Sequence, residues 1–358
     1  MEEILNAQKV SFGIDSFLEE ASKYSKKLSN DLNINSILES AMAGNIENVF
    51  DLNFLKNIFL NEVSVTIELM INVLIIIVIH SIFKAITENL ENSTASNVVY
   101  LAQYFSIVTV ITDTFLIVLD MTKSTISDVI SFMNILVPLL ISLMITTGSI
   151  ITGSKVQVIL IFIINLIGNF INLFLIPLLL VGITLTIVSN LSEKIQIDKL
   201  SKLFKSSIVW ILGIILTIFT GVLSIEGNLA SSVDGITSKT VKAAVTNFIP
   251  VVGKIMGDTV DTVLGCANIL KNSIGVIGLV IIIGIVIVPI IKIIVLWFSF
   301  KLTVGVCEII AEPKIIKLID GIADGYKILL AILISVSIMF VIGITIAINV
   351  SNSSIMYK

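Results

Sequence analysis

Residues 156–188 read VQVILIFIINLIGNFINLFLIPLLLVGITLTIV and contain no charged side chain. Backbone groups in lipid must be hydrogen-bonded within the chain, so an apolar run of this length predicts a membrane-spanning helix. At 1.5 Å per residue the helix would be about 50 Å long, whereas the hydrocarbon core of a bilayer is about 30 Å thick. The run therefore forms two tight spans, one helix broken at Gly168–Asn172 or near Pro177, or one steeply tilted helix.

The composition of the whole chain agrees with a membrane protein. Of 358 residues, 56% are hydrophobic and only 13% are charged, whereas about a quarter of the residues in a soluble domain are charged. The apolar runs do not alternate polar and apolar residues as barrel strands do. We therefore predict an all-α fold, a polytopic integral membrane helical bundle that contacts the lipid bilayer.

Further spans are predicted on either side of this run, giving about seven to nine in total because each needs about 20 apolar residues. These further spans are predicted at about residues 63–83, 98–119, 129–147, 207–224, 274–300 and 326–350. The predicted organisation is a polar extramembrane segment over 1–62, a multi-pass domain over 63–350 and a short tail over 351–358. No signal peptide is visible in the first segment, because a basic start followed by an apolar core is missing.

Lysine placement predicts the orientation. All 22 basic residues are lysines, and positively charged connectors tend to stay in the cytoplasm. The connectors 190–206 and 301–327 are therefore expected to be cytoplasmic. In the first, Ile197, Leu200 and Leu203 share one side of a helical wheel and the lysines the other, which predicts a helix lying in the membrane interface. The net charge of −4 and the lack of arginine argue against a nucleic-acid partner.

Polar side chains inside the predicted spans are candidates for function, because ionisable groups are costly in lipid. Glu68 and Asn72 share a face of the first span, Asp113 lies inside the second, and Lys292 interrupts 274–300. Such groups either line a path for a proton, cation or solute, or form hydrogen bonds between helices. Hydrogen bonding between helices is the favoured interpretation.

The same two alternatives apply to three asparagines in the central run. Asn165, Asn169 and Asn172 are spaced i, i+4, i+7 and so form a polar stripe on one side of a helix. A stripe of this kind lines a substrate path or bonds to neighbouring helices, and the second interpretation is favoured.

Signatures of enzymes are missing from the sequence. The single histidine excludes an HExxH zinc site, and neither a GxSxG elbow nor a Walker loop occurs. We predict no catalytic, cofactor or metal site. Cys266 and Cys307 are expected to pack as small apolar residues.

Residues 221–264 read GVLSIEGNLASSVDGITSKTVKAAVTNFIPVVGKIMGDTVDTVL and are more polar than their surroundings. In a helix that begins after Pro250, Lys254, Asp258 and Asp261 share one face. This face either binds a partner protein or is simply solvated, with charge pairs worth a few tenths of a kcal/mol. The candidate partner-binding residues are Asn247, Pro250, Gly253, Lys254, Asp258 and Asp261.

This block resembles the signature region of the stage III sporulation protein AE family, and the resemblance covers roughly the carboxy-terminal two thirds of the chain. It implies a multi-pass protein of endospore-forming bacteria, made in the mother cell and placed in the membrane around the forespore. It also implies partners, namely other stage III A sporulation membrane proteins and a forespore partner, in a channel or secretion-like complex that supports late forespore gene expression.

The chain departs from this family at its start. Family members often begin with a cleavable leader, whereas this chain begins with a polar Met-Glu-Glu segment. The resemblance places residues 1–62 outside the cytoplasm, whereas the lysine distribution favours the cytoplasm. The function expected from the sequence is a non-enzymatic subunit of this complex. The alternatives are a stand-alone secondary transporter of a small solute and a pure assembly scaffold.

Overall fold

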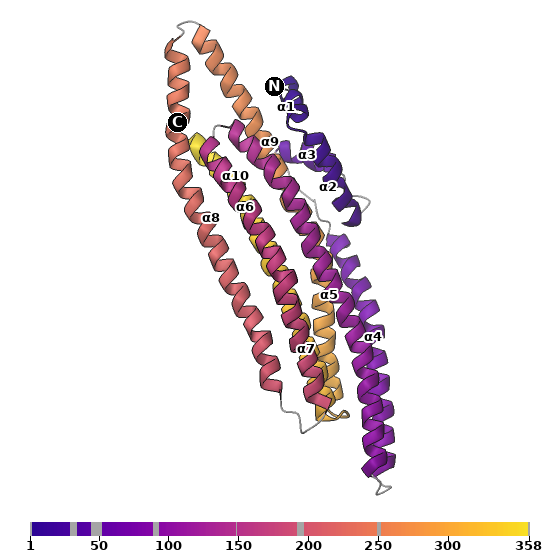
Figure 1. The fold of residues 1–358 in the computed structure, drawn as a ribbon. Coiled ribbons are helices and arrows are strands. Elements are labelled where there is room, and N and C mark those ends of the chain that lie inside the picture. Colours follow the sequence, from indigo (N-terminus) through magenta and orange to yellow (C-terminus); the bar gives the residue numbers. More distant parts are fainter. Residues whose placement is uncertain are drawn as a thin grey trace.

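The computed structural model describes residues 2–28, 34–43, 52–88, 93–147, 149–191, 197–248 and 252–356. These residues are helical or form short turns, which confirms the all-α class, and the long helices run up and down in an elongated bundle (Figure 1). In chain order the elements are α1 (Glu2–Ser11), α2 (Ile14–Leu28), α3 (Ile34–Met42), α4 (Leu52–Glu88), α5 (Ser93–Thr146), α6 (Ile150–Phe170), a π-helical turn η1 (Ile171–Leu175), α7 (Ile176–Leu191), α8 (Asp198–Phe248), α9 (Val252–Cys307) and α10 (Pro313–Met356).

Within the described ranges, six helical stretches are long and apolar enough to cross a membrane. They lie in α4, α5, the continuous path from α6 through η1 to α7, α8, α9 and α10. The expected count of seven to nine spans is not confirmed.

The difference arises chiefly in α5, which joins the two spans expected at 98–119 and 129–147. Asp120, Lys123 and Asp128 lower the average hydropathy between them, but they interrupt only one side of the helix. On the other side, Leu119 and Ile126 are fully buried and continue the core face. The buried stripe therefore runs through the charged segment, and the helix continues with it.

The run 156–188 forms a single path with a π-helical turn at Ile171–Leu175. Proline lacks a backbone N–H, and its ring displaces the carbonyl four residues earlier. For Pro177 that residue is Leu173, inside the turn, and a π-turn accommodates such a displaced carbonyl. The disturbance of the helix thus begins inside the first predicted position, Gly168–Asn172, and ends two residues before Pro177.

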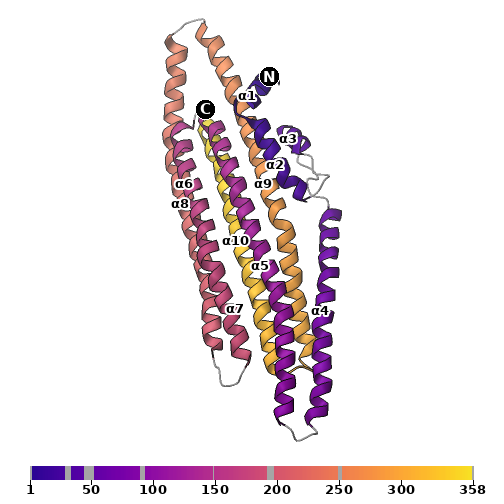
Figure 2. The same cartoon turned by 45° about the vertical axis from the view of Figure 1, so that its right-hand side comes forward.

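The up-and-down order gives the bundle two distinct ends (Figures 1 and 2). We call one of them the connector end; it contains the last turn of α7, the first turn of α8 and the turn between α9 and α10. At the other end, here the hairpin end, lie α1 to α3 and the end of α10. The last part of α8 and the first part of α9 extend beyond the other helices there.

The amino-terminal helices pack against the bundle near the hairpin end (Figure 2). The rings of Phe17 and Tyr24 in α2 lie 6.0 and 5.5 Å from that of Phe132 in α5. Gln8 Nε2 donates to the backbone oxygen of Val263 in α9 at 3.1 Å. The first spanning helix, α4, already begins at Leu52, inside the segment predicted as extramembrane.

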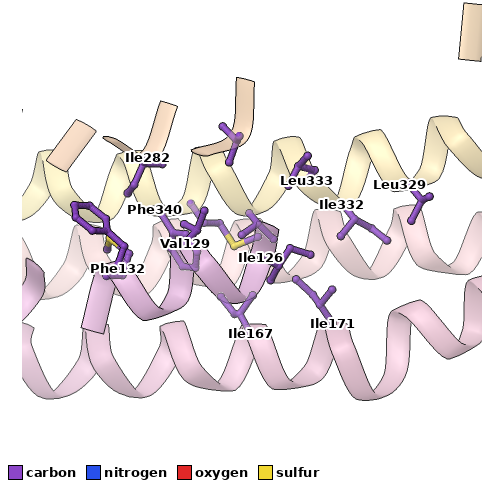
Figure 3. Close-up of a cluster of buried hydrophobic side chains, with 14 of the residues drawn as sticks. Ile126, Val129, Phe132, Ile167, Ile171, Ile282, Leu329, Ile332, Leu333 and Phe340 are labelled. Atoms are coloured by element: carbon purple, nitrogen blue, oxygen red, sulfur yellow. The ribbon is translucent and has the colours of Figure 1, made fainter. Parts of the chain in front are cut away.

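The core is built almost wholly from aliphatic and aromatic side chains of the spanning helices (Figure 3). Phe132 of α5, Ile167 of α6, Ile282 of α9 and Phe340 of α10 are all buried in one cluster. Burial of such side chains contributes roughly 25 cal/mol per Å² where the alternative is water. In lipid, the association of helices is stabilised instead by tight packing and polar contacts between them.

Candidate functional site

The asparagine stripe of α6 is divided by the structure. Asn165 and Asn134 of α5 form reciprocal amide hydrogen bonds, with Nδ2 to Oδ1 distances of 3.0 and 3.3 Å. Asn165 also donates to the carbonyl of Ile161 at 2.8 Å. This pair joins two adjacent helices, which agrees with hydrogen bonding between helices as the role of Asn165.

The other two asparagines do not join this pair. Asn169 is exposed on the outer surface of α6. Asn172 lies in the π-helical turn, and its Oδ1 atom is buried without a hydrogen-bond partner among the described residues. The expected continuous stripe is therefore one interhelical bond and two separate positions.

The ionisable residues predicted inside the spans are also placed separately. Lys292 of α9 lies 3.8 Å from the carboxylate of Glu62 in α4, an ion pair that joins these helices. Glu68 and Asn72 of α4 and Asp113 of α5 are exposed on the outside of the bundle. Glu62 was not predicted from the sequence, although Thr66, Val73 and Ile77 mark the buried stripe of α4 that leads back to it.

A buried polar cluster near the connector end was not predicted. Lys205 of α8 is 8% exposed, and its Nζ donates to the hydroxyl of Thr186 in α7 and to the carbonyl of Gly321 in α10, both at 2.8 Å. Ser201 Oγ lies 2.7 Å from the same Thr186 hydroxyl and donates to Gly182 O at 2.8 Å. We call Lys205, Thr186, Ser201 and the carbonyls of Gly182 and Gly321 the lysine cluster. It joins three helices.

The lysine cluster corrects the expectation for residues 190–206. Residues from Asp198 onward are the first turns of the spanning helix α8, not a separate interfacial helix. Leu200 and Leu203 are exposed, whereas Ser201 and Lys205 are buried. The missed signal is the stripe of buried Ile208 and Leu212, which leads back at helical spacing to Lys205 and Ser201.

An ion-pair group lies near the lysine cluster, at the adjoining turns of α9 and α10. Lys301 of α9 lies 2.5 Å from Asp320 and 3.2 Å from Asp324 of α10. The two carboxylates are four residues apart and so share one face of α10. All three side chains are partly exposed, so the group is suited to fixing α9 against α10.

The predicted partner-binding region lies at the hairpin end. Residues 221–248 form the last part of α8 and residues 252–264 the first part of α9, and α9 begins at Val252, just after Pro250 as expected. Outside the described part of the structure lie Pro250, the side chains of Asn247, Lys254, Asp258 and Asp261, and the surroundings of Gly253. Cys266 and Cys307, in contrast, are described as free and buried.

Comparison with known proteins now gives the family. The model of the family described as Stage III sporulation protein AE matches residues 32–351. The chain belongs to the stage III sporulation protein AE family. Stage III sporulation protein AE of Bacillus subtilis (strain 168) is 31% identical over 286 residues, which cover 79% of this chain and 72% of that protein. No solved structure matches the chain.

Membership in the stage III sporulation protein AE family confirms the resemblance and extends it to most of the chain. It implies a role in stage III of sporulation. With six long apolar helical stretches in its described residues, the chain is a multi-pass membrane protein of this family.

Proposed function

We propose that this chain is a non-enzymatic membrane subunit of a channel-like or secretion-like complex between mother cell and forespore. Its partners would be other stage III A sporulation membrane proteins and a forespore partner, and the complex would support late gene expression in the forespore. Family membership supports the link to sporulation. The observation that carries the subunit role is the outward position of Glu68, Asn72 and Asp113 on spanning helices.

This observation favours a subunit because the outer surface of a solitary membrane protein faces lipid. Polar groups in lipid-facing positions are costly, and they normally face protein or water instead. A chain that works with neighbours places such groups at the contacts. A stand-alone transporter places them around a shared interior site near the middle of the membrane.

The transporter alternative has weaker support for this reason. Of its candidate path residues, Asn165 is bonded to Asn134, and Lys292 is paired with Glu62. Asn169 is exposed on α6 and joins neither pair. A pure assembly scaffold, the other alternative, would use the same outward contacts without enclosing a conduit.

The proposed orientation places the connector end in the mother-cell cytoplasm. Lys199, Lys202 and Lys317 are exposed at this end, and positively charged connectors favour the cytoplasm. Because the chain crosses six times, α1 to α3 and the hairpin end then lie on the other side of this membrane, which surrounds the forespore. The lysine distribution favoured the cytoplasm for residues 1–62 when 98–119 and 129–147 were counted as two crossings and 156–188 as one.

We further propose that the hairpin end carries the partner-binding residues predicted from the sequence, from Asn247 to Asp261. Extension of α8 and α9 beyond the other helices supports this, because it leaves room for a partner around them (Figure 2).

Gene deletion in a sporulating host tests the proposed function. Without the gene, a late forespore reporter should stay silent while an early forespore reporter is expressed normally, and the full chain supplied in the mother cell should restore the late signal. Normal late expression in the deletion strain would refute the proposal. Restoration only when the chain is made in the forespore would refute the proposed site of action.

A further inference from the structure

One side of α5 carries a row of exposed polar side chains, interrupted between Asp113 and Asp120 by the exposed Leu116 and Ile117. We call Ser106, Thr109, Asp113, Asp120, Ser124 and Ser127 the α5 row; all six are exposed. Their spacing of three, four or seven residues places them on one face of the helix. From first to last the row is about 32 Å long, which is close to the thickness of the hydrocarbon core.

The exposed surface of α6 and α7 is very different. The exposed side chains along α6 and α7 include Val158, Phe162, Leu166, Leu173 and Val181, as expected for a surface in contact with lipid. The molecule therefore has an apolar flank at α6 and α7 and a polar row on α5.

The carboxylates of the α5 row and of the adjacent α4 indicate what kind of group the row contacts. Ser106 and Thr109 bond to carbonyls of their own helix at 2.8 and 2.9 Å, so their hydroxyls need no further partner. Asp120 lies 3.8 Å from Lys123. No hydrogen bond or ion pair joins Asp113, or Glu68 of the adjacent α4, to another described side chain. Among the described residues, these two acidic groups on neighbouring helices thus have no cationic partner.

We propose that the α5 row is the docking surface for a transmembrane helix of another subunit, and that this helix carries a lysine or arginine facing Asp113. This inference rests on the proposed role as a subunit of a membrane complex. Charge complementarity selects the occupant, because an intramembrane carboxylate is stabilised by a cationic partner. Ala102, Ser106 and Thr109 are small, which lets another helix approach closely.

A second copy of this chain fits the row less well. If two copies met through their α5 rows about a two-fold axis perpendicular to the membrane plane, each Asp113 would face its counterpart at the same depth. Like charges repel, so this contact is unfavourable. The chain contains no arginine, and Lys123 and Lys292 of its spanning helices are already paired within the chain.

Photo-crosslinking in sporulating cells tests the inference on the full chain. A benzophenone amino acid replaces Thr109 in the α5 row or, as the control, Phe162 on the apolar flank. We expect the Thr109 probe to crosslink to a transmembrane peptide that contains lysine or arginine, and the Phe162 probe to crosslink to lipid. D113N should lower the yield at Thr109 by about threefold or more, as for a typical interhelical polar contact, and D113E should retain it.

Three outcomes would overturn the inference. A Thr109 adduct with the same chain would indicate an interface between copies, and an adduct with lipid would make the row a lipid-facing surface. Reaction of T109C with a water-soluble thiol reagent in the assembled complex, without a protein crosslink, would indicate an aqueous conduit. Native electrophoresis of the same membranes separates the two proposals: absence of any complex contradicts the subunit role, whereas a complex with one of these outcomes contradicts only the docking surface.

Discussion

Lys205 in α8 donates a hydrogen bond to the backbone oxygen of Gly321 in α10, across 2.8 Å. The contact is close because Gly321 lacks a side chain: a Cβ atom there would meet the Thr186 methyl group and lie 3.6 Å from Lys205 Nζ. The lysine cluster thus depends on a glycine in the neighbouring helix.

The first prediction is that Gly321→Ala destabilises the bundle. Overpacking costs about 1–3 kcal/mol, which exceeds the gain of about 1 kcal/mol in helix propensity. Thermal unfolding in detergent should show a lower midpoint. The control is Gly213→Ala in α8, where no atom lies within 4 Å of the new Cβ, and no loss is expected. Equal midpoints for the two variants would mean that the contact at Gly321 relaxes without cost.

The second prediction separates the asparagines of α6. Asn165→Ala leaves Asn134 without its partner and should lower stability by roughly 0.6 kcal/mol, up to about 2. Asn169→Ala removes an exposed amide and should leave stability unchanged. Abundance in membranes and the unfolding midpoint measure both. Normal abundance of N165A together with loss of sporulation would point instead to a solute path.

The α-helical class and the positions of most spans could be predicted from the sequence because apolar runs leave the backbone little choice in lipid. The disturbance near Gly168–Asn172 and Pro177 was predictable for a similar reason, since proline cannot continue the hydrogen-bond ladder. The α5 helix was not predicted correctly. Averaging hydropathy over Asp120–Asp128 conceals that Leu119 and Ile126 on the opposite face remain buried.

The polar sites were harder to predict because one sequence does not show which helices are neighbours. Asn165 was expected to bond to another helix, but its partner Asn134 could be identified only once α5 and α6 were seen side by side. Lys205 was assigned to the membrane interface because it follows Lys199 and Lys202 on one side of a helical wheel, and only those two are exposed in the structure. Its burial depends on contacts with α7 and α10. These contacts form only when the three helices pack together in the folded chain.

The third prediction concerns orientation. In a variant with Cys266 and Cys307 replaced by alanine, Lys199→Cys at the connector end should resist a membrane-impermeant thiol reagent in spheroplasts of vegetative cells and react after lysis. Glu39→Cys, which lies in α3 near the hairpin end, should react without lysis. These results follow from the cytoplasmic preference of positively charged connectors. Labelling of K199C in intact spheroplasts would reverse the proposed orientation.

The fourth prediction tests the hairpin end. Asp258→Lys or Asp261→Lys should block sporulation by disrupting complex assembly, while the protein still inserts and accumulates. Glu308→Lys is the control, because Glu308 is exposed at the connector end. Co-purification from sporulating cells measures assembly. A D258K or D261K protein that keeps all its partners but is inactive would favour a role in conduction, and full activity would show that this face is only solvated.

The central claim is that the chain works as one subunit of a larger membrane complex. The most direct measurement is the mass and composition of the assembly that contains the tagged full chain after gentle solubilisation of membranes from sporulating cells. We predict a particle far larger than the 38.9 kDa chain, in which other stage III A sporulation proteins are present in fixed proportion. A chain recovered alone, from cells that sporulate normally, would contradict the account.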